Sequence, residues 1–220
     1  GTWVLKNLPV RVAAFLGMTG SQVNAEDALA LGIGTHLIEH ETREQVIAGL
    51  TGLKWQVGSV ADAARHNQAI AAEYFAAQAT PKAVPESELA KIDLAGIALE
   101  SAQECVDSIL ALDGSSEWAS RGVSNLRGGC PVTAAIVFEQ LQRLPQLTLA
   151  ESFRMEYAIA TECLRRGDFV EGVRALLVDK DRQPMWSVAN VAEVTAEVID
   201  AHFADNADAP GKQRLLAGLD

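Results

Sequence analysis

The stretch TLAESFRMEYAIATECLRRGDFVEGVRALLVDKDRQPMW, from Thr148 to Trp186, carries the pattern that decides the fold. Thr148 stands three residues before Glu151, and Asp168 stands three residues before Glu171. In each pair the first side chain can accept a hydrogen bond from the free amides of a first helical turn, and the glutamate can complement the helix dipole. Apolar residues then recur at helical spacing. The stretch therefore predicts two consecutive helices.

The same punctuation recurs along the rest of the chain. Further pairs are Asn24 and Asp27, Ser59 and Asp62, Ser101 and Glu104, and Asn190 and Glu193. With the apolar spacing, these pairs predict helices at about 7–19, 24–31, 41–53, 59–79, 101–111, 115–127, 131–143, 149–166, 168–179 and 190–203. Strand signal is confined to Thr35–Ile38 and, more weakly, to Val4 and Leu5. We therefore expect a mainly α fold with at most one or two short strands.

Proline and glycine placement suggests how the chain is divided. The segment from Thr80 to Ser87 contains Pro81 and Pro85, which is typical of a loop. We expect helices over 1–79, a linker with a short helix over 80–100, and a C-terminal helical domain over 101–203. The last stretch, 204–220, is predicted to be a mobile tail.

Composition excludes several classes of partner. The 220 residues are 49% hydrophobic and 21% charged, which is the balance of a globular protein. The net charge of −11 argues against binding to nucleic acid, whose phosphates need a cationic surface. It also argues against adsorption to anionic lipid, and no apolar run approaches the length of a membrane span.

Cysteine and histidine placement gives no metal site. The three cysteines lie far apart without CxxC spacing, which indicates reduced thiols in a reducing compartment. His36 and His40 are four residues apart, but the residues between them are those of a short extended segment, where that spacing gives no shared face. We therefore expect no bound metal.

Three blocks of the sequence resemble the crotonase superfamily, in the order in which that family has them. The first comprises GTWVLKNL at 1–8, FLGMTG at 15–20 and ALALGIGTH at 28–36, and the second is CPVT at 130–133. The third and most specific block is Met155-Glu156-Tyr157 followed by DFVEGVRALLVDKDRQPMW at 168–186, which is similar to the C-terminal signature of 3-hydroxyisobutyryl-CoA hydrolases. The resemblance spans residues 1–203 and implies the helical C-terminal portion of a crotonase-like α/β spiral.

The resemblance also implies that the main catalytic groups lie ahead of Gly1. Thioester hydrolysis needs two amides against the developing oxyanion and a carboxylate that activates water or forms an acyl intermediate. In the family these amides, a Glu and an Asp belong to segments that precede the position of Gly1. We therefore expect a fragment with no catalytic residue of its own, inactive alone, whose partner is the N-terminal half of the same protein.

Five residues are candidates for substrate contact. Gly1, Thr2 and Trp3 begin the helix that leaves the active-site turn in the family, although Trp3 is equally consistent with a core residue. Phe169 is expected either to border the adenine of coenzyme A or to fill the core, and Lys180 either to reach a phosphate of coenzyme A or to form surface ion pairs.

Other charged residues have structural interpretations. Arg174, Asp179, Lys180 and Asp181 are expected to form an ion network that holds their helix, with Gly172 allowing close approach of a neighbour and Trp186 as a packing anchor. The carboxylate pairs Glu26/Asp27, Asp179/Asp181 and Glu193/Glu197 are expected to be caps or solvated groups. Glu156 and Glu162 are expected to pair with arginines on their own helix, which are Arg154, Arg165 and Arg166.

These observations favour an acyl-CoA hydrolase acting on 3-hydroxyisobutyryl-CoA in valine breakdown, or on a similar short 3-hydroxyacyl-CoA. The alternatives are an enoyl-CoA hydratase or isomerase and, in another class, a non-catalytic helical interaction module. No cofactor is expected, since coenzyme A enters as part of the substrate. Apolar faces made for the absent portion predict a homo-oligomer. The expected location is the cytoplasm, or the mitochondrial matrix in a eukaryote.

Overall fold

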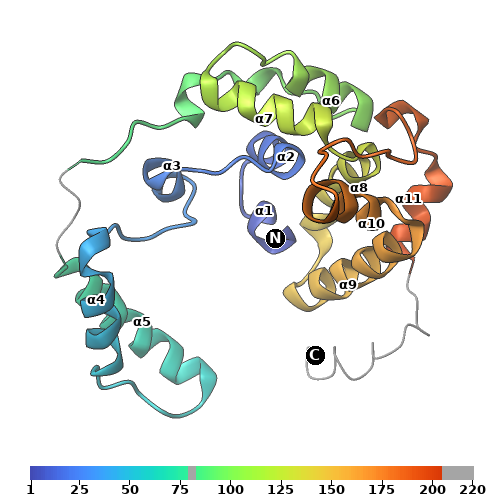
Figure 1. Cartoon of the computed structure of the whole chain (residues 1–220). Helices are drawn as coiled ribbons and strands as arrows, with labels where there is room; N and C mark the ends of the chain where they lie inside the picture. Colours follow the sequence, from blue (N-terminus) through green and yellow to red (C-terminus); the bar gives the residue numbers. More distant parts are fainter. Residues whose placement is uncertain (79–82, 205–220) are drawn as a thin grey trace. The chain divides into compact units, whose positions relative to one another are not determined.

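The computed structural model describes residues 1–78 and 83–204, and its contacts divide the chain into two units (Figure 1). The major unit contains Gly1–Gln22 and the chain from Ala90 onward, and the inserted unit is Val23–Leu89. The sequence predicted a division in chain order with a linker at 80–100. The packing instead joins the first 22 residues to the C-terminal helices.

Helices make up both units, so the mainly α fold class is confirmed. The described residues contain no strand. The major unit contains α1 (Thr2–Lys6), α2 (Val10–Thr19), α6 (Ala102–Leu110), α7 (Glu117–Gly128), α8 (Pro131–Arg143), α9 (Leu149–Arg166), α10 (Asp168–Val173), a π-helix (Arg174–Val178) and α11 (Ala196–Phe203), with short 3₁₀ turns at Leu94–Gly96, Leu144–Gln146 and Val191–Glu193. The inserted unit contains α3 (Ala25–Ala30), α4 (Arg43–Thr51) and α5 (Val60–Ala76), and 3₁₀ turns lie at His40–Thr42 and Leu89–Lys91.

Local capping explains where several of these helices begin. Asn24 and Ser101 accept from the backbone N–H groups of Asp27 and Glu104, as predicted. Thr148 and Glu151 form a complete capping box at the start of α9. Asp62, in a further predicted pair, lies outside the residues whose side chains are described.

The core of the major unit lies around α2. Phe15 of α2 is fully buried, and its ring centroid lies 5.2 Å from that of Trp118 in α7. Helix α8 approaches the other part of α2 so closely that a Cβ on Gly17 would lie 2.9 Å from Cγ1 of Val137. Only glycine fits this contact without displacing α8, so residues 10–19 and 131–143 form one packed layer.

Two predicted strands and two helix starts were wrong. Val4 and Leu5 lie in α1, and 35–38 is irregular because the described chain offers no strand to pair with it. The helix expected at 7–19 starts after Pro9, whose ring fixes the extended entry to α2. The helix expected at 190–203 begins with a 3₁₀ turn, and α11 starts only after Thr195, whose side chain accepts from the N–H of Val198.

Two predicted features concern residues outside the described part of the chain. These are the mobile tail, of which only Ala204 is described, and the start of the linker at 80–82. Among the helices of the described residues, none combines the length and the hydrophobicity that crossing a bilayer requires.

Candidate functional site

The predicted contact residues at the start of the chain are held by α8 and α9. The backbone N–H of Thr2 donates to Oε1 of Glu156 at 2.8 Å, and Nε2 of Gln140 donates to Oγ1 of Thr2 at 3.0 Å. Thr2 is only 4% exposed, and the amino group of Gly1 lies 3.4 Å from the same Glu156 oxygen. The first turn of α1 is therefore tied to two helices that lie far along the chain.

The electrostatics of Glu156 follow from this contact. Partial burial acts to raise the pKa of its carboxyl, but hydrogen bonds from Thr2 and the positive charge on Gly1 outweigh burial and hold the pKa below its ordinary value. The predicted pairing of Glu156 with an arginine of α9 was wrong, because the free amides of α1 lie within its reach. The pairing predicted for Glu162 is confirmed, with Arg166 Nε at 2.8 Å.

Trp3 does not face the large cavity of the major unit. It is half-buried, and Nζ of Lys6 lies 4.8 Å from the centroid of its ring. The Lys6 ammonium also donates to the backbone oxygen of Leu147. This contact is a cation–π interaction, so Trp3 joins α1 to the chain before α9.

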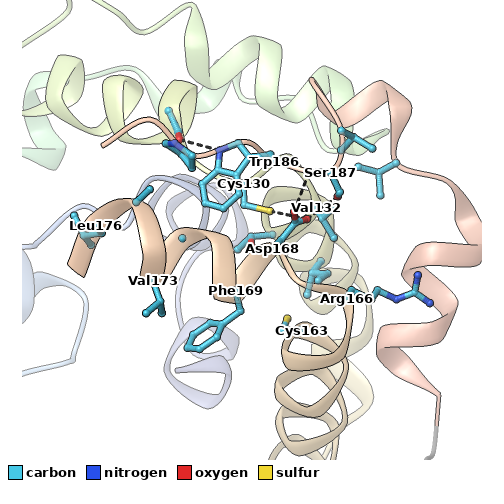
Figure 2. A pocket seen from close by; sticks show the side chains of 18 of the residues that line it. Cys130, Val132, Cys163, Arg166, Asp168, Phe169, Val173, Leu176, Trp186 and Ser187 are labelled. Atoms are coloured by element: carbon cyan, nitrogen blue, oxygen red, sulfur yellow. Dashed lines mark hydrogen bonds between the residues drawn. The ribbon is translucent and has the colours of Figure 1, made fainter. Parts of the chain in front are cut away.

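A cavity of about 1010 Å³ lies among α7, α8, α10, the π-helix, α11 and the segment after the π-helix (Figure 2). Its lining is mostly apolar, with side chains such as Val132, Ile136, Val173 and Leu176. Phe169, another predicted contact residue, lies on its wall and is 55% exposed. The size and lining are typical of a small-molecule site.

The segment after the π-helix, residues 179–187, forms one wall of this cavity, and we call it the clasp. Asp168 holds its end, since one carboxylate oxygen accepts from the N–H of Ser187 at 2.9 Å and the other from its hydroxyl at 2.7 Å. The Cys130 thiol lies 3.5 Å from the same carboxylate, and Figure 2 shows both contacts. Asp168 was predicted to cap a helix, which was wrong: Gly167, with φ of 94°, precedes the helix, and the carboxylate binds the clasp instead.

Trp186 fastens the clasp to two helices. Its Nε1 donates to the backbone oxygen of Gly128 at 3.2 Å (Figure 2). Its ring packs on α10, where a Cβ at Gly172 would meet Cη2 of Trp186 at 3.2 Å. The predicted roles of Gly172, as a site of close approach, and of Trp186, as a packing anchor, are both confirmed.

Arg174 is the centre of the ion network that holds the other end of the clasp. Its guanidinium bonds both oxygens of Glu171, at 2.7 and 2.9 Å, and reaches Asp179 at 2.6 Å and Asp181 at 2.7 Å. It also donates to the backbone oxygen of Gln183 at 3.1 Å. Hydrogen bonds from Arg174 and from the N–H of Met185 lower the pKa of Glu171 to about 2, and those to its carboxylate partners raise the pKa of Arg174.

The predicted ion network is confirmed except for Lys180. Lys180 and Arg182 have positive φ angles, 58° and 56°, and the described residues offer the Lys180 ammonium no ion pair. These left-handed positions alternate with Asp179 and Asp181, so the aspartates turn toward Arg174 while Lys180 is exposed to solvent. Glu171, predicted to complete a capping box, serves Arg174 instead.

The thiols of the major unit are poorly suited to nucleophilic attack. Burial raises the pKa of Cys105 to about 11, and burial is also the main cause that raises the pKa values of Cys130 and Cys163. The thiolate, which is the reactive form, is therefore scarce near neutral pH.

Carboxylates outside the cavity have structural partners. Asp27 is fully buried and accepts from the hydroxyl of Ser87 at 2.5 Å and from the N–H of Glu88 at 3.0 Å. Glu193 accepts from the amide of Asn190 and from the N–H of Ala189, so Asn190 donates where it was predicted to accept. These groups fix turns, in agreement with the structural interpretation of the carboxylate pairs.

Several residues of the site escaped sequence reasoning. Gln140, Cys130 and His202 carry no local pattern that places them at α1 or at the cavity. His202 is 1% exposed, lines the cavity, and its Nδ1 lies 2.7 Å from the backbone oxygen of Val198. Only an expectation of which helices pack together would have found them.

Comparison with known proteins gives consistent relatives. A 3-hydroxyisobutyryl-CoA hydrolase of mitochondria from Xenopus tropicalis is 32% identical over 207 residues, which are 92% of this chain and 51% of the relative. The Homo sapiens enzyme of the same name is 30% identical over 207 residues, with the same coverage. The chain thus spans about half the length of the curated relatives it matches.

Solved structures share the fold. An enoyl-CoA hydratase from Rhodobacter sphaeroides 2.4.1 superposes with a TM-score of 0.72 at 24% identity, covering 94% of this chain and 55% of that one. A carnitinyl-CoA dehydratase from Mycobacterium thermoresistibile gives 0.70 at 24% identity, covering 92% and 54%. The family model described as enoyl-CoA hydratase/isomerase matches residues 1–203. The chain therefore belongs to the enoyl-CoA hydratase/isomerase family of the crotonase superfamily, as a partial homologue of 3-hydroxyisobutyryl-CoA hydrolases.

Proposed function

We propose that the complete protein hydrolyses the thioester of a short 3-hydroxyacyl-CoA, with 3-hydroxyisobutyryl-CoA of valine breakdown as the first candidate. One observation carries the proposal. The run 168–186, by which the sequence resembles the hydrolases, folds as one device: α10, the π-helix and the clasp together wall the cavity. The hydrolase relatives support the same choice.

The proposed role of this chain is to hold substrate rather than to cleave it. The proposed contacts are Gly1, Thr2 and Trp3 at the start of α1, Phe169 on the cavity wall, and Lys180 in the clasp. The oxyanion amides and the catalytic Glu and Asp would come from the part of the protein that corresponds to the other half of the relatives. Burial of Thr2 and its tie to Glu156 give the first turn of α1 a fixed position. Without that other half, we expect no turnover.

The test is an assay of the complete protein with two substrates. Release of free thiol from 3-hydroxyisobutyryl-CoA is followed beside the loss of double-bond absorbance from an enoyl-CoA. Thiol release with little change in double-bond absorbance is the expected result. The reverse would make the protein a hydratase or isomerase, and neither reaction would leave a non-catalytic helical module.

Association is a further part of the proposal. Large apolar side chains are exposed on α10 and the π-helix, among them Val170, Leu176 and Leu177, at 56%, 59% and 63%. A cluster of this kind favours burial against another surface, so we expect a homo-oligomer or tight association with the other half of the protein. Light scattering combined with intact mass tests this, and a monomer of this chain alone would contradict it. By analogy with the relatives, the proposed location is the mitochondrial matrix in a eukaryote and the cytoplasm otherwise.

A further inference from the structure

One cation at the cavity is left without a carboxylate. Arg166 and Arg182 both line the cavity. Arg166 is neutralised by Glu162, whose carboxylate lies 2.8 Å from its Nε. For the guanidinium of Arg182, no acidic partner exists within the described residues. A fixed positive charge beside a mostly apolar cavity is therefore available to a ligand.

The backbone of Arg182 is held in place from three directions. Its N–H donates to the backbone oxygen of Ala175 at 3.0 Å, which closes the clasp onto the π-helix. On either side, Arg174 binds the carboxylate of Asp181 and the backbone oxygen of Gln183. These contacts keep Arg182 at a φ of 56°, a conformation that non-glycine residues adopt only where the surroundings impose it. The position of Arg182 is therefore a consequence of Arg174.

The other polar groups of the cavity are already engaged. The Asp168 carboxylate accepts from Ser187 and from the thiol of Cys130. His202 uses Nδ1 toward the backbone oxygen of Val198. Neither group neutralises Arg182, so an incoming anion would meet one cation and apolar walls.

We propose that the cavity binds an amphipathic anion, with its apolar chain among Val132, Ile136 and Leu176 and its carboxylate or phosphate against Arg182. Arg174 is the positioning residue that sets Arg182 at the cavity. This inference rests on the cavity and its charges and does not depend on the hydrolase proposal, since a ligand without a thioester satisfies it.

Titration calorimetry of the 220-residue chain with sodium decanoate and 1-decanol tests the proposal. The two probes share an apolar chain and differ in charge. Decanoate is expected to bind more tightly than decanol, and Arg182→Gln is expected to weaken decanoate binding about three- to tenfold, as for a charge-assisted contact at a partly exposed site. Decanol binding should stay within about twofold, because no charge is involved. Arg182→Lys should restore most of the decanoate affinity, and Arg121→Gln, on the exposed surface of α7, should change neither probe.

Arg174→Gln separates positioning from general damage. We expect it to lower decanoate affinity as Arg182→Gln does, while decanol affinity and a cooperative thermal transition are preserved. A wild-type response of Arg174→Gln to decanoate would overturn the positioning role. An equal loss for both probes in Arg182→Gln, or no saturable binding of either probe, would overturn the site.

A third probe distinguishes the sources of the anion. Decanoyl-CoA that displaces decanoate and is weakened by Arg182→Gln would assign the contact to a phosphate of a coenzyme A thioester. Decanoate binding that decanoyl-CoA does not displace would assign it to a free carboxylate. Both results support an anionic head group, and the hydrolysis assay is read separately from either.

Discussion

Removing the Glu156 carboxylate should destabilise the major unit through the start of α1. Glu156→Ala leaves the N–H of Thr2, in a residue that is 4% exposed, without its 2.8 Å partner. A buried donor without a partner costs about 1–3 kcal/mol. Since the Glu156 side chain is 32% exposed, water can reach part of the vacated site, and we expect the lower range, about 1–2 kcal/mol. For a domain of this size, that corresponds to a fall of about 2–8 °C in Tm.

The comparison variant for this prediction is Glu156→Gln. It keeps an oxygen that can accept from Thr2 but removes the charge, so its loss should be about half that of Glu156→Ala. The matched control is Glu117→Gln, because Glu117 is 88% exposed and pairs with Arg121 only at 3.8 Å, and it should change stability by less than about 0.5 kcal/mol. Urea unfolding at 25 °C and pH 7, followed by circular dichroism, gives all three values.

The sign of the pH dependence gives a second check. The pKa of Glu156 is lowered in the folded chain, so its stabilisation is complete above the unfolded pKa and is lost as pH falls through the folded one. The stability difference between the wild type and Glu156→Gln should therefore shrink below about pH 4. If Glu156→Ala were no worse than Glu117→Gln at pH 7, the contact between α1 and α9 would not be an anchor.

Three further outcomes follow from the core, the clasp and the thiols. Phe15→Ala, at a fully buried position beside Trp118, should cost about 3–5 kcal/mol in urea unfolding; a loss below about 1 kcal/mol would contradict the described core. Since the pKa of Glu171 is lowered to about 2, the anchoring of the clasp by Arg174 should weaken only as pH falls from about 4.5 toward 2, measured as faster amide exchange after the π-helix; weakening between pH 7 and 5 would refute this. Cys105, fully buried with a pKa of about 11, should be the slowest thiol to react with iodoacetamide at pH 7.5, as read by peptide mass spectrometry; modification faster than that of the other two would count against its burial.

Sequence reasoning succeeded where the deciding contacts are local. The caps at Asn24, Ser101 and Thr148 each join groups three residues apart, so the pattern alone contains the interaction. Asp168 failed for the opposite reason. A left-handed glycine precedes its helix, and the carboxylate is drawn to Ser187, 19 residues further along, which no local pattern reveals.

The candidate site shows the same limit at longer range. The ion partners of Arg174 were predictable because they lie within one helix and the following turn. Glu156 was assigned to its own helix, whereas its partner, Thr2, lies 154 residues away in sequence. The failure of Lys180 to join the network depends on a backbone conformation that its residue type does not predict.

The division of the chain also bears on its synthesis. Helix α2 leaves the ribosome early, yet the surfaces that cover Phe15 and Gly17 belong to α7 and α8, more than a hundred positions later. At translation speeds of about 5–20 residues per second, its apolar face stays uncovered for on the order of ten seconds. The nascent protein therefore has an interval in which chaperones can bind this face and premature association can begin. That interval would close if α2 were moved by circular permutation to follow the last helix.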